Sequence, residues 1–597
     1  MQQDERAASL KRHLFSKVIF MLIRTFSDIQ TLIEAGDLSE AEHTLIHNCK
    51  SGRLTKLGDG TCPDGPSEGR TIRAALLRYL ILGGCEKCQV HEWGVKLEGA
   101  WISGLLDLSF ASSRGATGLI NCNFEHKVVA LKTRFEFLNM TGTKLPGLYV
   151  QGIIVMGDVF LRRLINTGDV NLAGAEIGGQ LIFTGAQLGS GDGRALNAQG
   201  VRVKSDLVLC DLKSKGEVRL AGAEIVGQLD FTGAELDGAD GQALNAQRLT
   251  VAGGFVWRQI KSVKGRIAFN SAQLGGLVDS AASWEMVENL NLIGLTYENL
   301  IGPLDLRFRK SWLKKGAQFN GSFYPQPYQQ LARFYRETGH RREAREILIE
   351  KEIQQRKAVR GRWRDELRFR RNLRKFLEHV NNKEPLQALN VSATKVAELS
   401  ENWGELFKQR FGKSDWVQNR DPLVVSLLRQ DFRNQLLWDN AKTVLRLLFH
   451  RSADRVYRYV TGYGYKPGRS LLVLAFLIAC MTALAQVSWN MGDLTPNSDV
   501  IQISSEWQNL SRTEERPAEV WAKQYGRDYE TFEPFFYAAD VVIPIINIGQ
   551  TDAWGPSTER SWWGWSMFGV QKLFVILGWV VTAIAAASVT NMIRRDD

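Results

Sequence analysis

The chain has few of the residues that build a disulfide framework or a redox centre. Its 597 residues include only seven Cys, an odd and scattered set, so we predict no disulfide framework and a soluble part that lies in the cytoplasm. Haem-attachment CxxCH sequences, iron–sulfur ligand spacings and catalytic-triad signatures are also missing. These absences favour a protein that is not an enzyme, and we predict no cofactor.

Two Gly-containing stretches lack what a phosphate-binding loop needs. GYGYKPG at 462–468 is followed by an apolar run, and Pro467 stands where the free N–H groups of a helix start are required. The triplet at 412–414 reads GKS, but Phe407 occupies the position of the upstream Gly. Clusters of Asp with Gly at nonapeptide spacing are missing as well, which argues against a calcium-filled β-roll.

The N-terminal part predicts a helical cap over residues 1–89. Apolar residues recur at helical spacing in 10–36 and again in 70–82, where a Gly pair at 83–84 is suited to end a helix. The apolar patch Val18 to Ile23 has basic neighbours but no small-residue cleavage site, so we predict a packed helix rather than a signal peptide.

A repeat dominates the middle of the chain. The segment that begins GDVNLAGAEIGGQLIFTGA at Gly168 returns 48 residues later as GEVRLAGAEIVGQLDFTGA. Each copy contains a shorter echo of eleven residues, in which apolar residues alternate and a Gly-Ala pair follows. Strands of three or four residues with small corners predict a right-handed parallel β-solenoid over 90–322, closed by GPLDLRF at 302–308.

Two side-chain sets within this region are candidate sites. Asn197 and Asn245 hold matching positions in the two copies, so their amides are expected to stack and to satisfy turn carbonyls, with a ligand-binding ladder as the alternative. Before the solenoid, Cys62, the CxxC pair Cys85 and Cys88, and His91 suit tetrahedral zinc, although a turn without metal is favoured because a second CxxC is missing.

After the solenoid the chain returns to helical patterns. A helical hairpin and a basic helix are predicted for 323–380, and a helical linker for 381–465. Lys351 to Lys375 contains eleven basic and three acidic residues. This charge suits a solvated face, anionic lipid headgroups or nucleic acid, and the nearby apolar runs favour lipid over nucleic acid.

Two uncharged apolar runs predict a membrane domain over 466–597. Ser470 to Trp489 and Leu573 to Ile593 are 20 and 21 residues long, enough for helices of about 30 Å that cross the hydrocarbon core. Lys442 to Arg469 holds seven basic residues and one Asp, whereas the loop 490–571 holds five basic and twelve acidic residues. Both termini are therefore expected on the cytoplasmic side and the loop on the other.

Within the loop, FEPFFYAADVVIPIINIGQ at 532–550 is too short to span a bilayer. A helix, Pro544 and an extended stretch containing Asn547, Gly549 and Gln550 predict either a re-entrant loop or an amphipathic helix on the outer surface. The four named residues are our pore-loop candidates.

The order of span, Phe-rich short helix, Gly-containing loop and span resembles the two-helix pore domain of potassium-type channels, although the TVGYG filter motif of that family is absent. A second resemblance involves the LAGAEI-type coils, PQPYQQLARFYRETGH at 325–340, TGYGYKPGRS at 461–470 and PIINIGQ at 544–550. With these motifs the chain is similar to bacterial pentapeptide-repeat-like solenoid membrane proteins often labelled membrane-associated oxidoreductases.

Our leading hypothesis is a multi-pass protein of the bacterial inner membrane. A cytoplasmic solenoid would act as a recognition or assembly surface coupled to a channel-like two-span domain that conducts ions. The expected partners are the lipid bilayer, further copies in a homo-oligomer, and a protein or small molecule on the solenoid, but not nucleic acid. The alternatives are a membrane-associated oxidoreductase, which the family label implies, and a non-conducting envelope scaffold.

Overall fold

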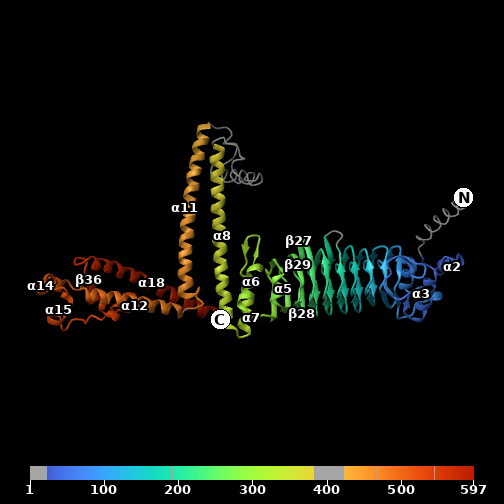
Figure 1. Ribbon diagram of the computed structural model, residues 1–597, viewed down its shortest axis with the longest axis horizontal. Coiled ribbons are helices and arrows are strands. Elements are labelled where there is room, and N and C mark those ends of the chain that lie inside the picture. Colours follow the sequence, from blue (N-terminus) through green and yellow to red (C-terminus); the bar gives the residue numbers. More distant parts are fainter. Residues whose placement is uncertain (1–22, 190–192, 382–421, 467, 544, 597) are drawn as a thin grey trace. The chain divides into compact units, whose positions relative to one another are not determined.

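The chain forms two compact units, Met1–Gln354 and Gln355–Asp597. The computed structural model describes residues 23–189, 193–381, 422–466, 468–543 and 545–596, and Figure 1 shows the helices and strands of both units. The predicted helix at Val18 to Ile23 falls almost wholly outside the described residues, as do Pro544 and much of the predicted linker 381–465.

Short helices begin the first unit, as predicted. They are α2 (Phe26–Glu34), α3 (Glu40–Ser51) and α4 (Ala74–Ile81). Thr25 and Ser39 form capping boxes at the starts of α2 and α3. In the second box, the buried Glu42 also accepts a hydrogen bond of 2.8 Å from Nε of Arg73, and that bond fixes α3 against strand β2 (Thr71–Arg73).

A parallel β-solenoid of about nine turns fills most of the first unit, which confirms the predicted fold. Its strands run from β1 (Thr55–Lys56) to β32 (Thr296–Ile301) and form two sheets of 16 strands each. The first strands lie upstream of the predicted start at residue 90. At the other end, residues 306–308 belong to helix α6 (Leu306–Gly316) rather than to a closing strand, because Asp305 caps that helix.

One coil has four sides. It passes through β14 (Val159–Phe160), β15 (Ile165–Asn166), β16 (Val170–Asn171) and β17 (Glu176–Ile177) before β18 (Leu181–Ile182) pairs with β14. The strands are shorter than predicted because the chain turns every five or six residues. The eleven-residue echo therefore corresponds to half a coil rather than to a repeating unit of its own.

The 48-residue repeat equals two coils of unequal length. In the column that contains β18, Leu181 lies 22 residues after its partner Val159 and 26 residues before its partner Leu207. The same alternation occurs in the β16 column, where Val170 pairs with Leu148 and Leu196. Stacking in register places the apolar residue of each strand above that of the previous coil, and this continuous core holds the solenoid together.

The Gly-Ala pairs form corners of the coil. Gly174 and Gly185 have φ values of +66° and +69°, and the following Ala175 and Ala186 are fully buried. A left-handed backbone is readily adopted by Gly, and the small Ala side chain then fits beneath the corner.

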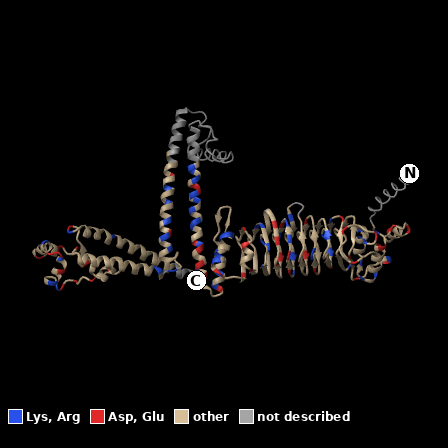
Figure 2. Cartoon of the chain, in the orientation of Figure 1, with Lys and Arg blue, Asp and Glu red and all other residues tan. Residues whose placement is uncertain are grey.

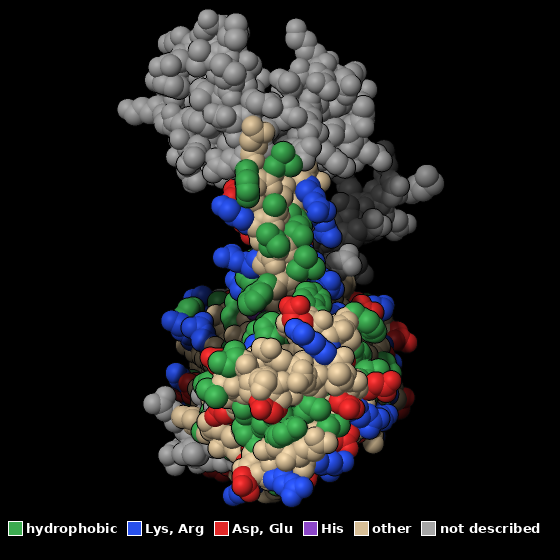
Figure 3. All heavy atoms as spheres, turned by 90° about the vertical axis from the view of Figure 1, so that its left-hand side faces the viewer, with side chains coloured by type: hydrophobic (Ala, Val, Ile, Leu, Met, Phe, Trp, Pro, Cys, Tyr) green, Lys and Arg blue, Asp and Glu red, His purple; other side chains and the backbone are tan. Residues whose placement is uncertain are grey.

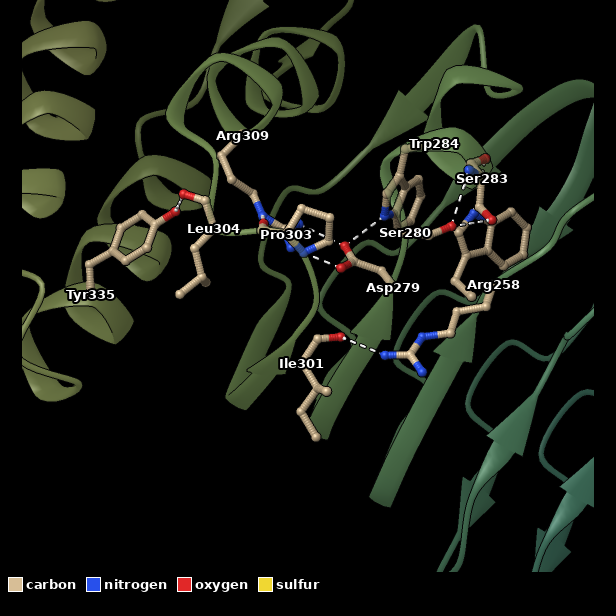
Figure 4. Close-up of polar contacts among 11 residues, drawn as sticks. Arg258, Asp279, Ser280, Ser283, Trp284, Ile301, Pro303, Leu304, Arg309 and Tyr335 are labelled. Carbon is tan, nitrogen blue, oxygen red and sulfur yellow. Dashed lines mark hydrogen bonds and ion pairs between the residues drawn. The ribbon is translucent and has the colours of Figure 1, made fainter.

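At its C-terminal end, the solenoid core is covered by aromatic side chains and a buried ion pair. Trp257 stacks on Trp284, which in turn contacts Trp312 of α6. Arg309 of the same helix is fully buried and donates to both carboxylate oxygens of Asp279, at 2.7 and 2.8 Å. Figure 4 shows that Asp279 also accepts a hydrogen bond from Trp284, while Arg309 donates to the carbonyl of Pro303. Because the charged groups of Asp279 and Arg309 are paired within the protein, we interpret the cluster as a structural end cap.

The helical hairpin predicted after the solenoid is present. It consists of α7 (Gln326–Glu337) and the start of α8 (Arg341–Asn381), separated by a short break at 338–340. Tyr335 of α7 donates a hydrogen bond of 2.9 Å to the carbonyl of Leu304, so the hairpin rests on the same end of the solenoid as Arg309.

The second unit contains the two predicted apolar helices, α12 (Gly468–Asn490) and α18 (Trp562–Asp596). Both are long and apolar enough to cross a membrane, and Figure 2 shows few charged residues along them. The other helices described in this unit are the end of α8 and α11 (Pro422–Thr461), and between the apolar pair α13 (Asp499–Gln502), α14 (Ser505–Thr513), α15 (Pro517–Gln524), α16 (Pro534–Val542) and α17 (Gln550–Ala553).

The C-terminal end of α12 and the N-terminal end of α18 are connected by strand pairing and hydrogen bonds at the two ends of the intervening loop. Antiparallel strands β35 (Leu494–Pro496) and β36 (Trp554–Pro556) pair there. Ser561, just before α18, donates 2.8 Å to the carboxylate of Asp493, and Trp563 donates 3.0 Å to the hydroxyl of Ser488 on α12. The loop 490–571 is therefore a folded structure with its own closed base.

The buried pair at the solenoid end gives a stability prediction. Arg309→Met leaves Asp279 as an uncompensated buried charge, so we expect the free energy of unfolding to fall by about 3–5 kcal/mol, measured by urea titration of the full chain in detergent. The matched control is Lys261→Met, which removes an exposed pair with Asp211 and should cost less than about 1 kcal/mol. Equal effects of the two variants would contradict the prediction, and adding Asp279→Asn to Arg309→Met should recover part of the loss.

Candidate functional site in the loop between the two apolar helices

The short helix α16 packs between the two apolar helices. It contacts both α12 and α18, and its second part, from Tyr537 to Val542, is buried. The approach to α18 is close, because a Cβ atom added at Gly578 would lie 2.0 Å from the carbonyl oxygen of Val542. A Gly at this point of α18 lets the end of α16 rest directly on the neighbouring helix backbone.

A buried carboxylate on α16 holds the loop that follows. Asp540 is 9% exposed, and one of its oxygens accepts a hydrogen bond of 3.0 Å from the backbone N–H of Ile548. The other accepts from the backbone N–H and the hydroxyl of Thr551, at 2.8 and 2.9 Å. A buried carboxylate requires such partners, and here they fold the extended stretch back along the helix.

The side chain of Gln550 makes hydrogen bonds at the N-terminal end of α16. Its amide nitrogen donates to the carboxylate of Glu530 and to the carbonyl of Thr531, both at 2.8 Å, and its oxygen accepts from the backbone N–H of Glu533 at 3.1 Å. Glu533 is the N-cap residue of α16 and its own side chain makes no cap hydrogen bond. The buried Gln550 side chain therefore caps the helix from the loop.

Between these two anchors the loop presents apolar side chains outward. Ile545 is 78% exposed, and Ile546 and Ile548 are exposed as well. The exposed Phe535 and Phe536 add to this surface from the start of α16. Five large apolar side chains on one short segment are thus exposed in the part of the chain that the structure describes.

The pore-loop candidates divide into anchoring and outward residues. Gln550 is an anchor, whereas Asn547 is exposed and its oxygen accepts a hydrogen bond of 2.9 Å from the backbone N–H of Gly549. Gly549 has φ +89°, and a Cβ atom built there would meet nothing within 4 Å. The sequence indicated this loop but not the role of Asp540, although a lone acid within an apolar run was the available signal.

The candidate zinc ligands do not gather into one cluster. Over the described ranges, no group of three or more His, Cys, Asp or Glu residues is placed to hold a metal ion. Cys62 donates a hydrogen bond of 3.4 Å to the carbonyl of Cys122, and Nδ1 of His91 accepts one of 3.2 Å from the backbone N–H of Trp93. Burial raises the pKa of the Cys62 and Cys88 thiols, which opposes the thiolate form that zinc binds, whereas a hydrogen bond with Tyr79 lowers the pKa of the partly exposed Cys85.

The two candidate ladder residues occupy equivalent places two coils apart. Arg219 lies between Asn197 and Asn245 in the same column, so their side chains do not stack on each other. Each oxygen instead accepts a hydrogen bond from the backbone N–H two residues later, and the amide of Asn197 donates 3.3 Å to Asn171 of the previous coil. The two Asn side chains therefore stabilise turns by accepting hydrogen bonds from backbone N–H groups of the turn, and not by donating to turn carbonyls as predicted.

Comparison of the chain with protein-family models, with curated proteins and with solved structures gave no match.

The Asp540 anchor predicts a specific change in loop protection. Asp540→Asn keeps the shape of the side chain but weakens its bonds to Ile548 and Thr551, because charge-assisted hydrogen bonds are about twice as strong as neutral ones. We expect faster amide hydrogen exchange in 545–553 while α12 and α18 stay protected. Asp528→Asn, at an exposed position, is the control, and unchanged exchange in the Asp540 variant would argue against the anchoring role.

The close contact between α16 and α18 gives a second prediction. Gly578→Leu adds a side chain where even a Cβ atom would collide with the backbone of Val542, so α16 must move away and the thermal midpoint in detergent should fall. Gly569→Leu is the matched control, since it lies on the same helix with nothing within 4 Å of an added Cβ atom. Equal midpoints for the two variants would rule out this packing.

Proposed function

We propose that the chain is an integral membrane protein of the bacterial inner membrane with a pore-forming two-span domain and a cytoplasmic solenoid for recognition or assembly. The observation that carries this proposal is the exposure of the two apolar helices. Only 17% of the most apolar stretch of each helix is buried, whereas the core helix of a soluble protein buries most of such a surface. Leu472, Phe476 and Ile576, for example, are each at least 60% exposed.

Exposed apolar surface of this extent is unfavourable in water and favourable in lipid. Each fully buried Leu, Ile or Phe side chain gains roughly 1.5–3 kcal/mol relative to water, and a bilayer offers that environment to every outward residue of α12 and α18 at once. The exposed Trp562 and Trp565 at the start of α18 suit the membrane interface, where indole keeps its N–H hydrated. The charge balance on either side of α12 supports cytoplasmic termini.

The loop after α16 supports a pore made by several copies. Non-helical backbone at membrane depth is tolerated only where protein covers it or where it lines a water-filled cavity. The exposed Ile545 and Ile546 require cover from protein or lipid, and neighbouring copies around an axis would supply it while Asn547 and Gly549 face the centre. The layout of span, short helix, extended loop and span then provides a short polar constriction.

The solenoid supports the recognition role through its regular surface. Strand columns repeat the same outward position on successive coils, as with Glu176, Arg202 and Glu224, which form ion pairs of 2.9 and 3.5 Å along one column. Such a surface presents side chains at a constant spacing to an elongated partner.

The experiment that tests the pore is conductance in planar bilayers. The full chain, purified from the membrane fraction after an alkaline wash, should conduct ions when reconstituted. Gly549→Val should reduce the conductance strongly, because a β-branched residue is strained at φ +89°. Gly569→Ala should conduct like the wild type.

Two outcomes would contradict parts of the proposal. Release of the full chain into the supernatant of the alkaline wash would exclude the membrane assignment. Membrane-bound protein that never conducts, even with cell extract as a source of ligands, would exclude the pore and favour the scaffold.

A further inference from the structure

Helix α11 carries a stripe of large apolar side chains that the described part of its own unit leaves exposed. Trp438 and Phe449 are 70% and 76% exposed, and Leu445, Leu448, Val456 and Tyr459 are exposed as well. Positions 438, 445, 449 and 456 recur at intervals of seven, four and seven residues, which places them on one face of a helix. We call the six residues the outward stripe.

The opposite face of α11 is covered by α8. Arg360 of α8 donates 2.7 Å to the carboxylate of Asp454, and Arg370 donates 3.1 Å to the hydroxyl of Thr443. Between these contacts, the rings of Trp363 and His450 meet edge to face at 5.0 Å. The outward stripe is therefore not the face by which α11 packs within the second unit.

Basic residues border the outward stripe on both sides. At 100° per residue, Lys442 and Arg446 fall on one edge and Arg451, Arg455 and Arg458 on the other, and all five are exposed. Figure 3 shows the result as a line of hydrophobic side chains along the helix with Lys and Arg at its edges. Among the described side chains of α11 the acids are Asp439 and Asp454, and both are partly buried.

The outward stripe faces the same side from which the apolar helices extend. Figure 1 shows α11 crosswise to α12 and α18, with its C-terminal end beside the ends of both, and α11 contacts both helices. The turn at the end of α11 is packed on α18, because a Cβ atom added at Gly464 would lie 3.9 Å from the hydroxyl of Ser588. In Figure 3, α12 and α18 extend toward the viewer, and so does the outward stripe.

We infer that α11 is an interfacial helix, which lies in the plane of the bilayer with the outward stripe among the lipid acyl chains and its bordering basic residues at anionic headgroups. An amphipathic helix with Trp, Phe and Leu on one face and Lys and Arg at its edges binds in this way. The inference rests on the proposed function, since the two apolar helices must cross the bilayer for α11 to lie along its surface.

Charge favours lipid over a second copy of α11 as the cover of the outward stripe. Two identical stripes packed face to face would bring the basic edges of one helix against the basic edges of the other, whether the pair is parallel or antiparallel. Such like-charge contacts are unfavourable. Anionic lipid headgroups are complementary to both edges at once.

Spin labels test the depth of the outward stripe. Phe449→Cys and Arg451→Cys place a nitroxide at two exposed positions two residues apart, in full-length protein whose partly exposed Cys62, Cys85, Cys210 and Cys480 are replaced by Ala. The labelled protein is reconstituted into vesicles of phosphatidylcholine and phosphatidylglycerol. We expect the label at 449 to collide severalfold more with oxygen, and severalfold less with a water-soluble nickel complex, than the label at 451.

The outcomes separate this inference from the proposed function. Equal access of the nickel complex to both labels would overturn the interfacial helix, and so would dipolar broadening at 449, which would indicate a second copy. A label at Phe476→Cys on α12 reports the spans independently. If the label at 476 is exposed to lipid and the label at 449 to water, the membrane assignment is kept and only the interfacial position of α11 is excluded. If the label at 476 is exposed to water, the membrane assignment and the interfacial position of α11 are both excluded.

Discussion

Both units of this protein depend on the removal of apolar side chains from water, but the two units bury these side chains to different extents. In the solenoid, every coil covers the apolar residues of the previous one, and the core is continuous from the N-terminal helices to the Trp residues at the far end. In the second unit the fold covers only a few residues of α12 and α18. In the function proposed above, lipid or further copies of the chain cover the surface that remains.

Buried charge is used sparingly, and in each place it fixes how two elements meet. Asp279 and Arg309 join the last coils of the solenoid to the helix that covers them, and Asp540 joins a short helix to the loop that returns along it. Asp279 is paired with the guanidinium of Arg309, whereas Asp540 accepts hydrogen bonds from uncharged donors. A buried charge that loses its partners is costly, which suits positions where an irregular segment must adopt one conformation.

The sequence predicted those parts of the structure that depend on local pattern. Two nearly identical copies of 48 residues indicate stacked coils, and uncharged runs of about 20 residues indicate the apolar helices. The four sides of the coil were not evident, because each eleven-residue echo contains two short strands, such as β16 and β17, and the alternating apolar pattern does not separate them. Arg309 and Asp279 are 30 residues apart with no shared motif, so their pairing depends on tertiary structure alone. The outward stripe of α11 became recognisable only once the face covered by α8 was known.

The alternation of 22- and 26-residue coils bears on how the length of the solenoid can change. Removing Gly168 to Lys215 would place Gly216 where Gly168 stands and Val218 where Val170 stands, so every strand column would continue without a shift of register. The body of the protein can therefore grow or shrink in steps of two coils, about 10 Å each at the usual strand spacing. Adding or removing two coils in the middle would change the length of the solenoid but leave the residues at both of its ends unchanged. The length of the solenoid can therefore vary independently of what its ends bind.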